Sequence, residues 1–170
     1  WIGAGSQLAE NVMQTTIKED AMCVGEICNR EVIIIDREGS IREAAGLMRE
    51  YHVGNVVVVE QRDDERIPVG ILTDRDIVLE FIALDVDIDS VTVGDAMSFD
   101  LLIAREEDGV METINRMRSK GVRRIPVVNN RGGLAGILAV DDLIELISEQ
   151  LMDLSKLVMG EQKREHKDRP

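Results

Sequence analysis

An internal duplication constrains the fold of this chain more than any other feature of its sequence. The segment Val24-Gly25-Glu26-Ile27 recurs 69 residues later as Val93-Gly94-Asp95-Ala96. Self-similarity at a fixed spacing is the signature of a repeated structural unit. The same offset aligns Glu43 with Glu112, Met48-Arg49 with Met117-Arg118, Val53 with Val122, and Val58-Val59 with Val127-Val128.

The spacing between the two copies shortens toward the end of the unit. Gly70-Ile71-Leu72 matches Gly136-Ile137-Leu138 at an offset of 66, and Asp76 matches Asp142. The second copy therefore lacks three residues between its paired strands. Deletions fall in surface loops, and the charged segment 61–66 has the composition of such a loop.

Each copy predicts the element order β-α-β-β-α. Ser40 and Glu43 have the spacing of a capping box that starts a helix, and the apolar residues that follow recur at helical spacing. Four consecutive valines at 56–59 indicate a strand covered on both faces. The first copy is expected to hold a strand at 32–36, a helix from Ser40, strands at 55–60 and 67–72, and a helix at 73–84. The second is expected to hold a strand at 101–104, a helix at 109–120, strands at 125–129 and 134–138, and a helix from 140 to about 158.

We predict an α/β (α+β) fold in which two β-α-β-β-α repeats pack sheet to sheet with pseudo-two-fold symmetry. A unit of about 60 residues is marginal alone, which favours two packed units over two independent domains. We expect the tail to be disordered from Glu161 onward because it is almost wholly polar. The predicted divisions are an N-terminal extension at 1–20, a first domain at 21–85, a linker at 86–92, a second domain with a long final helix at 93–158, and a polar tail at 159–170.

The acidic charge of the chain argues against a nucleic-acid polymer as its partner. The 170 residues carry a net charge of −13 and only four aromatic side chains. Nucleic-acid polymers are bound by basic surfaces and by stacking aromatic rings. The acid excess is uneven, since residues 1–89 carry a net charge of −11 and residues 90–170 carry −2.

Cysteine usage and hydropathy predict the compartment. Cys23 and Cys28 are too few for a disulfide framework or a structural zinc site, so we expect free thiols in a reducing cytosol. No apolar run approaches the ~20 residues of a membrane-spanning helix, and no signal peptide is recognisable. We therefore expect a cytoplasmic protein without a membrane partner.

The sequence does not contain the pattern of a catalytic or metal centre. It has no glycine-rich phosphate loop, no His-Glu-x-x-His and no nucleophile elbow. The acidic segment 85–89 alternates like a calcium loop but lacks the glycine and the terminal glutamate of one, so we interpret it as linker. We predict no catalytic residues, no metal and no catalytic cofactor.

The element order, the duplication and the segment from Gly70 to Asp76 together resemble a tandem pair of cystathionine β-synthase (CBS) domains, also called a Bateman module. That segment reads Gly-Ile-Leu-Thr-Asp-Arg-Asp, and the resemblance covers about residues 20–150. It implies two clefts between the copies, which in many members bind adenine nucleotides or other adenosyl compounds. Such modules are not enzymes, because they bind a ligand and change shape or association.

The resemblance implies that Thr73 and Asp76 hold the ribose of the ligand. A hydroxyl and a carboxylate three residues apart at a helix start can face one spot, and the carboxylate can accept from both ribose hydroxyls. The same Thr-x-x-Asp pattern is a capping box, so a structural role is the alternative. In the second copy Ala139 replaces the hydroxyl while Asp142 remains. We therefore expect this second ribose pocket to be weaker or empty, and one cleft to dominate.

Three arginines are candidates for contacting phosphate groups. Arg75 lies in the same turn, where the family often has a phosphate contact and where a helix start favours anions. Arg123 and Arg124 close a run of five bases in nine residues and enter the strand beside the predicted cleft. The resemblance places their counterparts, Gly54 and Asn55, beside the base or the phosphates. The alternative is a surface ion pair for Arg75 and solvated surface for the basic run.

The adenine is expected to lie between aliphatic side chains and to take hydrogen bonds from backbone groups, which suits a chain so poor in aromatics. An ordinary core position is the alternative for each aliphatic candidate. The candidate walls are Val53, Val122, Ile125 and Pro126.

We predict an adenine-nucleotide sensor that stands alone, with AMP, ADP, ATP or NAD as its regulatory ligand. Apolar stripes on the helices at 73–84 and 140–158 favour a homodimer, and any protein effector is a separate chain. The alternative is a ligand-free module for oligomerisation or partner docking. The missing hydroxyl of the second copy and the long amphipathic final helix support that alternative.

Overall fold

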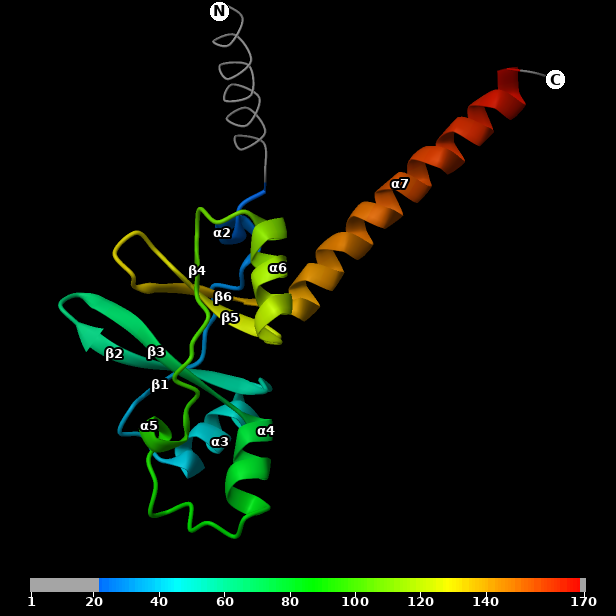
Figure 1. Cartoon of the computed structure of the whole chain (residues 1–170). Coiled ribbons are helices and arrows are strands. Elements are labelled where there is room, and N and C mark those ends of the chain that lie inside the picture. Colours follow the sequence, from blue (N-terminus) through cyan, green and yellow to red (C-terminus); the bar gives the residue numbers. More distant parts are fainter. Residues whose placement is uncertain (1–21, 169–170) are drawn as a thin grey trace, which may run out of the picture.

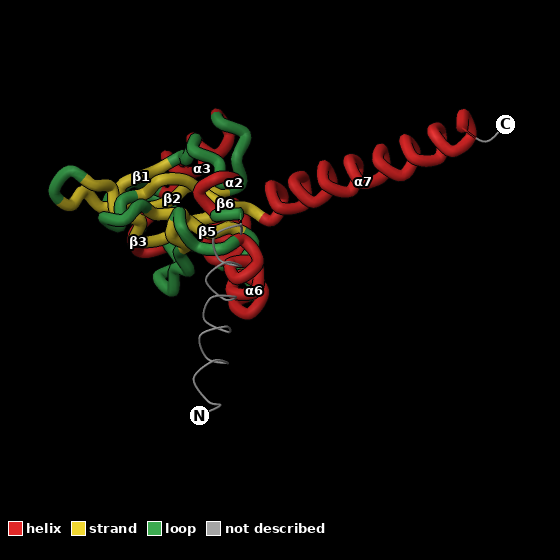
Figure 2. Tube along the Cα trace, turned by 90° about the horizontal axis from the view of Figure 1, so that it is seen from above, coloured by secondary structure: helices red, strands yellow, loops and turns green. Residues whose placement is uncertain are grey.

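The chain forms two stacked halves, each with one small sheet and its helices (Figure 1). The computed structural model describes the backbone of residues 22–168 and the side chains of residues 22–161. The predicted N-terminal extension at 1–20 lies outside the described residues. The last helix, α7, leaves the body and points away from it, as the view from above also shows (Figure 2).

Both copies contain the predicted β-α-β-β-α order, each preceded by a short helix that was not predicted, and the strand expected at 101–104 lies instead at Ala104–Arg105. The first part of the chain holds α2 (Val24–Ile27), β1 (Ile34–Asp36), α3 (Ile41–Glu50), β2 (Asn55–Arg62), β3 (Glu65–Thr73), α4 (Asp74–Asp76) and the π-helix η1 (Ile77–Ile82). The second part holds α5 (Val93–Ala96), β4 (Ala104–Arg105), α6 (Val110–Lys120), β5 (Arg124–Val128), β6 (Leu134–Ala139) and α7 (Val140–Asp168).

The two sheets have the same topology, which confirms the predicted fold class. Their strand orders are β1-β2-β3 and β4-β5-β6, with the first pair parallel and the second antiparallel in each. Each antiparallel pair shifts register at the same repeat position, between Val58 and Val59 in one sheet and between Val127 and Val128 in the other. The sheets contact each other through β3 and β6.

Local sequence signals explain the main elements of the first copy. The side chain of Ser40 accepts the N–H of Glu43 at 3.1 Å, so the predicted N-cap of α3 is confirmed. The valines 56–59 of β2 are all buried, as expected of a strand covered on both faces.

Two helices differ from the prediction. The helix expected at 73–84 divides into the short α4 and the π-helix η1, in which the N–H of Ala83 bonds the carbonyl of Val78, five residues back. Helix α7 continues to Asp168, so the prediction of a disordered tail is wrong for 161–168. That stretch consists mainly of good helix formers and contains neither Gly nor Pro, so nothing in it stops the helix.

Each copy begins with a short helix, here called its lead-in: α2 in the first copy and α5 in the second. Each lead-in packs in the core of the other copy. Figure 1 shows α5 with the β1-β2-β3 half and α2 with the β4-β5-β6 half. Val93 and Met97 are buried in the first core, and Val24 and Cys28 are buried in the second. Burial raises the pKa of the Cys28 thiol, which favours its neutral form in that core.

Matched hydrogen bonds fix both exchanged lead-ins. The N–H of Gly25 donates to the carbonyl of Glu106 at 2.9 Å. At the equivalent place, the N–H of Gly94 donates to the carbonyl of Arg37 at 2.8 Å. An added Cβ on Gly25 would lie 2.9 Å from Cβ of Glu106, and one on Gly94 would overlap the Arg37 side chain. The repeated glycine therefore permits the close approach of two backbones.

At the edge of each contact between a lead-in and the other copy, a pair of side chains interacts. The two pairs stand at equivalent repeat positions but interact in different ways. Arg30 Nη1 donates to Glu106 Oε1 at 2.6 Å, and this hydrogen bond raises the pKa of Arg30. On the other side, the Arg37 guanidinium carbon lies 5.9 Å from the centre of the Phe99 ring. The repeat offset relates Arg30 to Phe99 and Arg37 to Glu106. An ion pair in one place and a cation–π contact in the other therefore link the same two repeat positions.

The exchanged packing predicts a large difference between two glycine substitutions. A Cβ added to Gly70 would overlap Sδ of Met97 and lie 2.7 Å from its Cγ, whereas a Cβ on Gly46 in α3 meets nothing within 4 Å. We expect Gly70→Ala to lower the free energy of unfolding by about 1–3 kcal/mol through overpacking. Gly46→Ala is expected to raise it by about 0.5–1 kcal/mol through helix propensity. Urea denaturation measures both, and an equal effect at the two sites would contradict the packing described.

Candidate ligand-binding cleft

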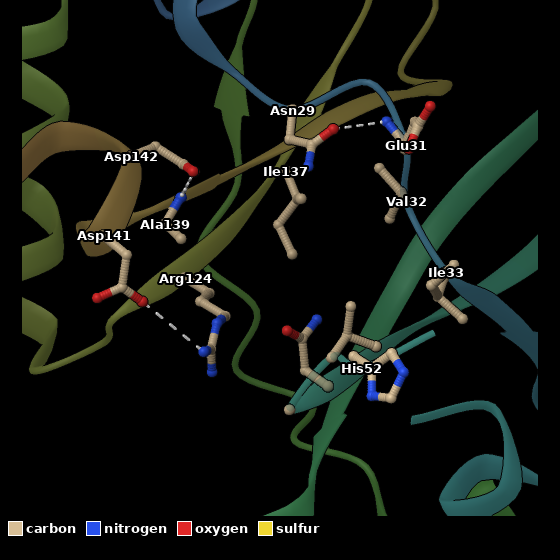
Figure 3. A pocket seen from close by; sticks show the side chains of 13 residues that line it. Asn29, Glu31, Val32, Ile33, His52, Arg124, Ile137, Ala139, Asp141 and Asp142 are labelled. Atoms are coloured by element: carbon tan, nitrogen blue, oxygen red, sulfur yellow. Dashed lines mark hydrogen bonds and ion pairs between the residues drawn. The ribbon is translucent and has the colours of Figure 1, made fainter. Parts of the chain in front are cut away.

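A cleft of about 220 Å³ lies at the seam between the two halves (Figure 3). Both copies contribute to it: the segment after α2, the turn before β2, the starts of β5 and α7, and the end of β6. The lining residues are Asn29, Glu31, Val32, Ile33, His52, Val53, Gly54, Asn55, Arg124, Ile137, Ala139, Asp141 and Asp142.

A carboxylate is fixed at the start of α7, on the wall of the cleft. Asp142 Oδ2 accepts the N–H of Ala139 at 2.8 Å, which holds the carboxylate at the first turn of the helix (Figure 3). The negative charge is also favoured there by the helix dipole. Asp142 is half-buried, so it is oriented and yet reachable by a ligand.

The equivalent carboxylate of the first copy makes a complete capping box. Thr73 Oγ1 donates to Asp76 Oδ2 at 2.7 Å, and the N–H of Thr73 donates to the same oxygen at 3.0 Å. The N–H of Asp76 in turn donates to Thr73 Oγ1 at 3.2 Å. The structural role weighed for this pair is therefore present. A ribose-binding role for the same residues stays a prediction.

Arg124 projects into the cleft from β5 (Figure 3). Its side chain is 32% exposed, and its Nη2 lies 4.0 Å from Asp141 Oδ2. A Cβ added to Gly54 would lie 3.7 Å from Arg124 Nη1, so the guanidinium passes over this glycine. Arg123 is 75% exposed, and its Nη2 lies 3.7 Å from Asp141 Oδ1. Asp141 therefore faces both guanidinium groups.

The cleft brings together five of the residues singled out from the sequence. They are Val53, Gly54, Asn55, Arg124 and Asp142.

The other predicted residues do not line this cleft. Ile125 and Pro126 are fully buried, and Val122 packs against the same second core, so ordinary packing accounts for these three side chains. Arg123 lies at the surface beside Asp141. Thr73, Arg75 and Asp76 occupy, in the first copy, the positions that Ala139, Asp141 and Asp142 occupy in the second.

Sequence reasoning missed the lining residues that follow the first lead-in. The N–H of Asn29 donates to the carbonyl of Ile137 at 2.9 Å, and Asn29 Oδ1 accepts the N–H of Glu31 at 2.8 Å. The first bond joins the segment to β6 of the second copy, and residues 29 and 31–33 line the cleft. The N–H of the equivalent Ser98 donates to the carbonyl of Ile71 at 3.0 Å, so the contact is repeated in the structure, but no sequence pattern signalled it.

The structure indicates the kind of chemistry for which the cleft is suited. Within residues 22–161, no group of three or more His, Cys, Asp or Glu side chains is arranged to hold a metal ion. Over the described helices, none is both long enough and apolar enough to cross a membrane.

A fixed carboxylate, one guanidinium and aliphatic walls favour binding of a small polar molecule with an apolar face.

A family model matches the chain twice. The model for the CBS domain matches residues 24–83 and again residues 93–149. An uncharacterized protein of Methanopyrus kandleri is 34% identical over 126 residues, which cover 74% of this chain and 63% of that protein. A 17.7 kDa protein of Acidianus ambivalens is 32% identical over 144 residues, covering 85% of this chain and 82% of that protein. The chain thus spans less than two thirds of the first relative.

Solved structures share the fold. The CBS domain pair of protein MJ0100, solved in complex with 5′-methylthioadenosine and S-adenosyl-L-methionine, superposes with a TM-score of 0.65 at 23% sequence identity. The match covers 76% of this chain and 98% of that one. The duplication and the sheet topology therefore have a direct counterpart in a known architecture.

The two copies allow a reciprocal test of the cap. We expect Thr73→Ala to lower the free energy of unfolding by about 1 kcal/mol, because Asp76 loses its hydroxyl partner. Ala139→Thr would place the same hydroxyl beside Asp142, and it is expected to raise the free energy of unfolding by a similar amount. Chemical denaturation of both variants checks this. If Ala139→Thr destabilised the protein, the two turns would not be equivalent.

Proposed function

The chain belongs to the CBS domain family, as a tandem pair, and from that premise we propose that it is a non-catalytic regulatory module binding an adenosyl ligand. The observation that carries the proposal is the fixed Asp142 carboxylate on the wall of a cleft built from both copies, although the sequence predicted the weaker pocket on this side because Ala139 lacks the hydroxyl of Thr73.

The carboxylate of Asp142 suits the ribose of such a ligand. A carboxylate accepts hydrogen bonds through several lone pairs, so it can accept from Ala139 and still take two neighbouring hydroxyls. The half-buried site lowers competition from water, which strengthens a charge-assisted hydrogen bond. Asp76 offers the same group at the equivalent position of the first copy.

The walls of the cleft suit the adenine. Val32, Ile33, Val53 and Ile137 provide aliphatic surface from both copies. The volume of about 220 Å³ is below the range of roughly 300–1,000 Å³ common for drug-sized ligands. The cleft therefore fits the adenosine part shared by AMP, ADP, ATP, NAD and S-adenosylmethionine, with any larger group directed outward.

The position of the cleft supports a regulatory effect. Its lining comes from both copies, so a ligand contacts the two halves at once. A ligand shifts a conformational equilibrium only as far as it binds the two states differently, and a seam between two packed units provides such a difference. The ligands in the MJ0100 complex support the adenosyl class for this fold.

Ligand binding is expected to raise the thermal stability of the protein. At a ligand concentration of 100 times Kd, the stabilisation is about 2.7 kcal/mol by mass action. We expect AMP, ADP, ATP, NAD or S-adenosylmethionine to raise the melting temperature, measured by scanning fluorimetry. The double variant Asp76→Ala with Asp142→Ala should lose the rise.

Asp153→Ala is the matched control, because Asp153 is an exposed carboxylate on α7 that pairs with Lys156 at 2.9 Å outside the cleft. It should keep the ligand-induced rise. If none of the five compounds raised the melting temperature of the unaltered protein, the proposed function would be overturned.

A homodimer is proposed as the state that responds to the ligand. Exposed apolar residues on α7 follow one another at spacings of three and four, which is the seam of a coiled coil. From Ser148 to Leu157, the side chains that directly adjoin the seam are uncharged. A second copy of the strongly acidic chain can therefore approach there. The α7 seam consists of Ile144, Ile147, Leu151, Leu154 and Val158.

Charges placed in the α7 seam are expected to separate the protomers. Leu151→Glu combined with Leu154→Glu would bury two acids against their own copies, which is strongly unfavourable. Sedimentation equilibrium should then give one chain mass of 19.0 kDa in place of twice that value. Lys156→Glu alters the opposite face of the helix and should leave the dimer intact. A monomeric unaltered protein at micromolar concentration would contradict this expectation.

The α7 seam also favours a second candidate function, a docking module that binds no ligand. This alternative predicts no thermal shift with any adenosyl compound, together with a change in association when residues 151–170 are removed. The two experiments above therefore separate the candidates.

A further inference from the structure

Asp141 lines the cleft at the start of α7, at the repeat position that Arg75 occupies in the first copy. We infer that Asp141 makes the cleft at Asp142 selective for adenosyl compounds that lack phosphate groups and are neutral or cationic. The inference rests on the proposed function, since it names the chemical class of the ligand at that same site.

The lining of the cleft has an excess of negative charge. Glu31, Asp141 and Asp142 contribute three carboxylates, against the single guanidinium of Arg124. A phosphate brought into this cleft would meet like charges, which costs affinity and lowers the association rate. A sulfonium or ammonium group would instead be attracted.

Asp141 also forms ion pairs with the two guanidinium groups that could otherwise bind a phosphate. Its two carboxylate oxygens face Arg123 Nη2 at 3.7 Å and Arg124 Nη2 at 4.0 Å. Arg124 lines the cleft, and Arg123 lies at the surface beside Asp141. A phosphate could reach them only by displacing Asp141 or by lying beside it.

The positive end of α7 is compensated in the same way. A helix start favours anions, so α7 alone would attract a phosphate. Its first turn already contains Asp141 and Asp142, which satisfy that preference from within the chain. The helix therefore adds no attraction for an anionic ligand at this cleft.

The other copy has the opposite charge at the decisive position. The repeat offset of 66 places Arg75 where the second copy has Asp141. Arg75 is exposed and adjoins Asp76, so in the first copy a cation lies next to the carboxylate that is proposed to bind ribose. The two turns thus differ by two units of charge at this residue, although Asp74 of the first copy, which corresponds to Val140, offsets one of them.

The test uses three probes that share adenosine and differ in charge. Isothermal titration compares uncharged 5′-methylthioadenosine, cationic S-adenosylmethionine and anionic AMP in the Asp76→Asn background, which removes the ribose carboxylate of the first copy. We expect 5′-methylthioadenosine and S-adenosylmethionine to bind at least about tenfold more tightly than AMP. Raising the salt concentration should weaken S-adenosylmethionine and leave 5′-methylthioadenosine unchanged.

Two variants at position 141 are expected to invert the preference. Asp141→Arg should raise the affinity for AMP by about tenfold or more and lower that for S-adenosylmethionine, with Asp141→Asn giving a smaller change in the same direction. Asp153→Arg makes the same change in net charge elsewhere on α7 and should alter neither affinity. It controls for the overall field of the acidic chain.

The outcomes separate this inference from the proposed function. If none of the three probes binds the unaltered protein, the proposed function fails, and the inference with it. If AMP binds as tightly as 5′-methylthioadenosine in the Asp76→Asn background, the function stands and the selectivity is wrong. Unchanged AMP affinity in both Asp141→Asn and Asp141→Arg would also overturn the role of Asp141.

Discussion

The exchange of the two lead-in helices is the constraint on which the rest of the structure depends. A unit of about 60 residues buries only enough apolar surface to be marginally stable alone. Val24 and Cys28 complete the second core, while Val93 and Met97 complete the first. Neither core is therefore whole without the other copy, and the two copies are expected to unfold as one cooperative body.

The same exchange builds the cleft. After α2 leaves the second core, Asn29 pairs with Ile137 of β6, and by Ile33, whose carbonyl accepts the N–H of Val57, the chain has reached the first sheet. The hydrogen bond from Asn29 to Ile137 guides this crossing. The crossing segment becomes one wall of the cleft, opposite the start of α7. Under the proposed function, a ligand held there would contact the connection that links both cores, and its binding would change how the halves pack.

The repeat made much of the fold predictable, because it identifies equivalent positions and local patterns identify the elements. It could not reveal which copy each lead-in packs against, since the partners are distant along the chain, as with Gly25 and Glu106 or Gly94 and Arg37, and propensity is a local property. Ile125 and Pro126 illustrate the same limit at the site, because a strand beside a cleft has the apolar pattern of any core strand. Asp141 went unnoticed because an acid at a helix start is common.

Duplication also explains how one scaffold can hold two different sites. The buried positions of the two copies must stay alike, because each lead-in has to fit the other core. The positions at the rim have no such restriction, and there Thr73 and Arg75 of one copy correspond to Ala139 and Asp141 of the other. The net charge of −13 describes neither rim by itself. If the proposed ligand binds, the side chain beside Asp76 or Asp142 is expected to decide whether an anion enters, because charge acts mainly within a Debye length of about 8–10 Å.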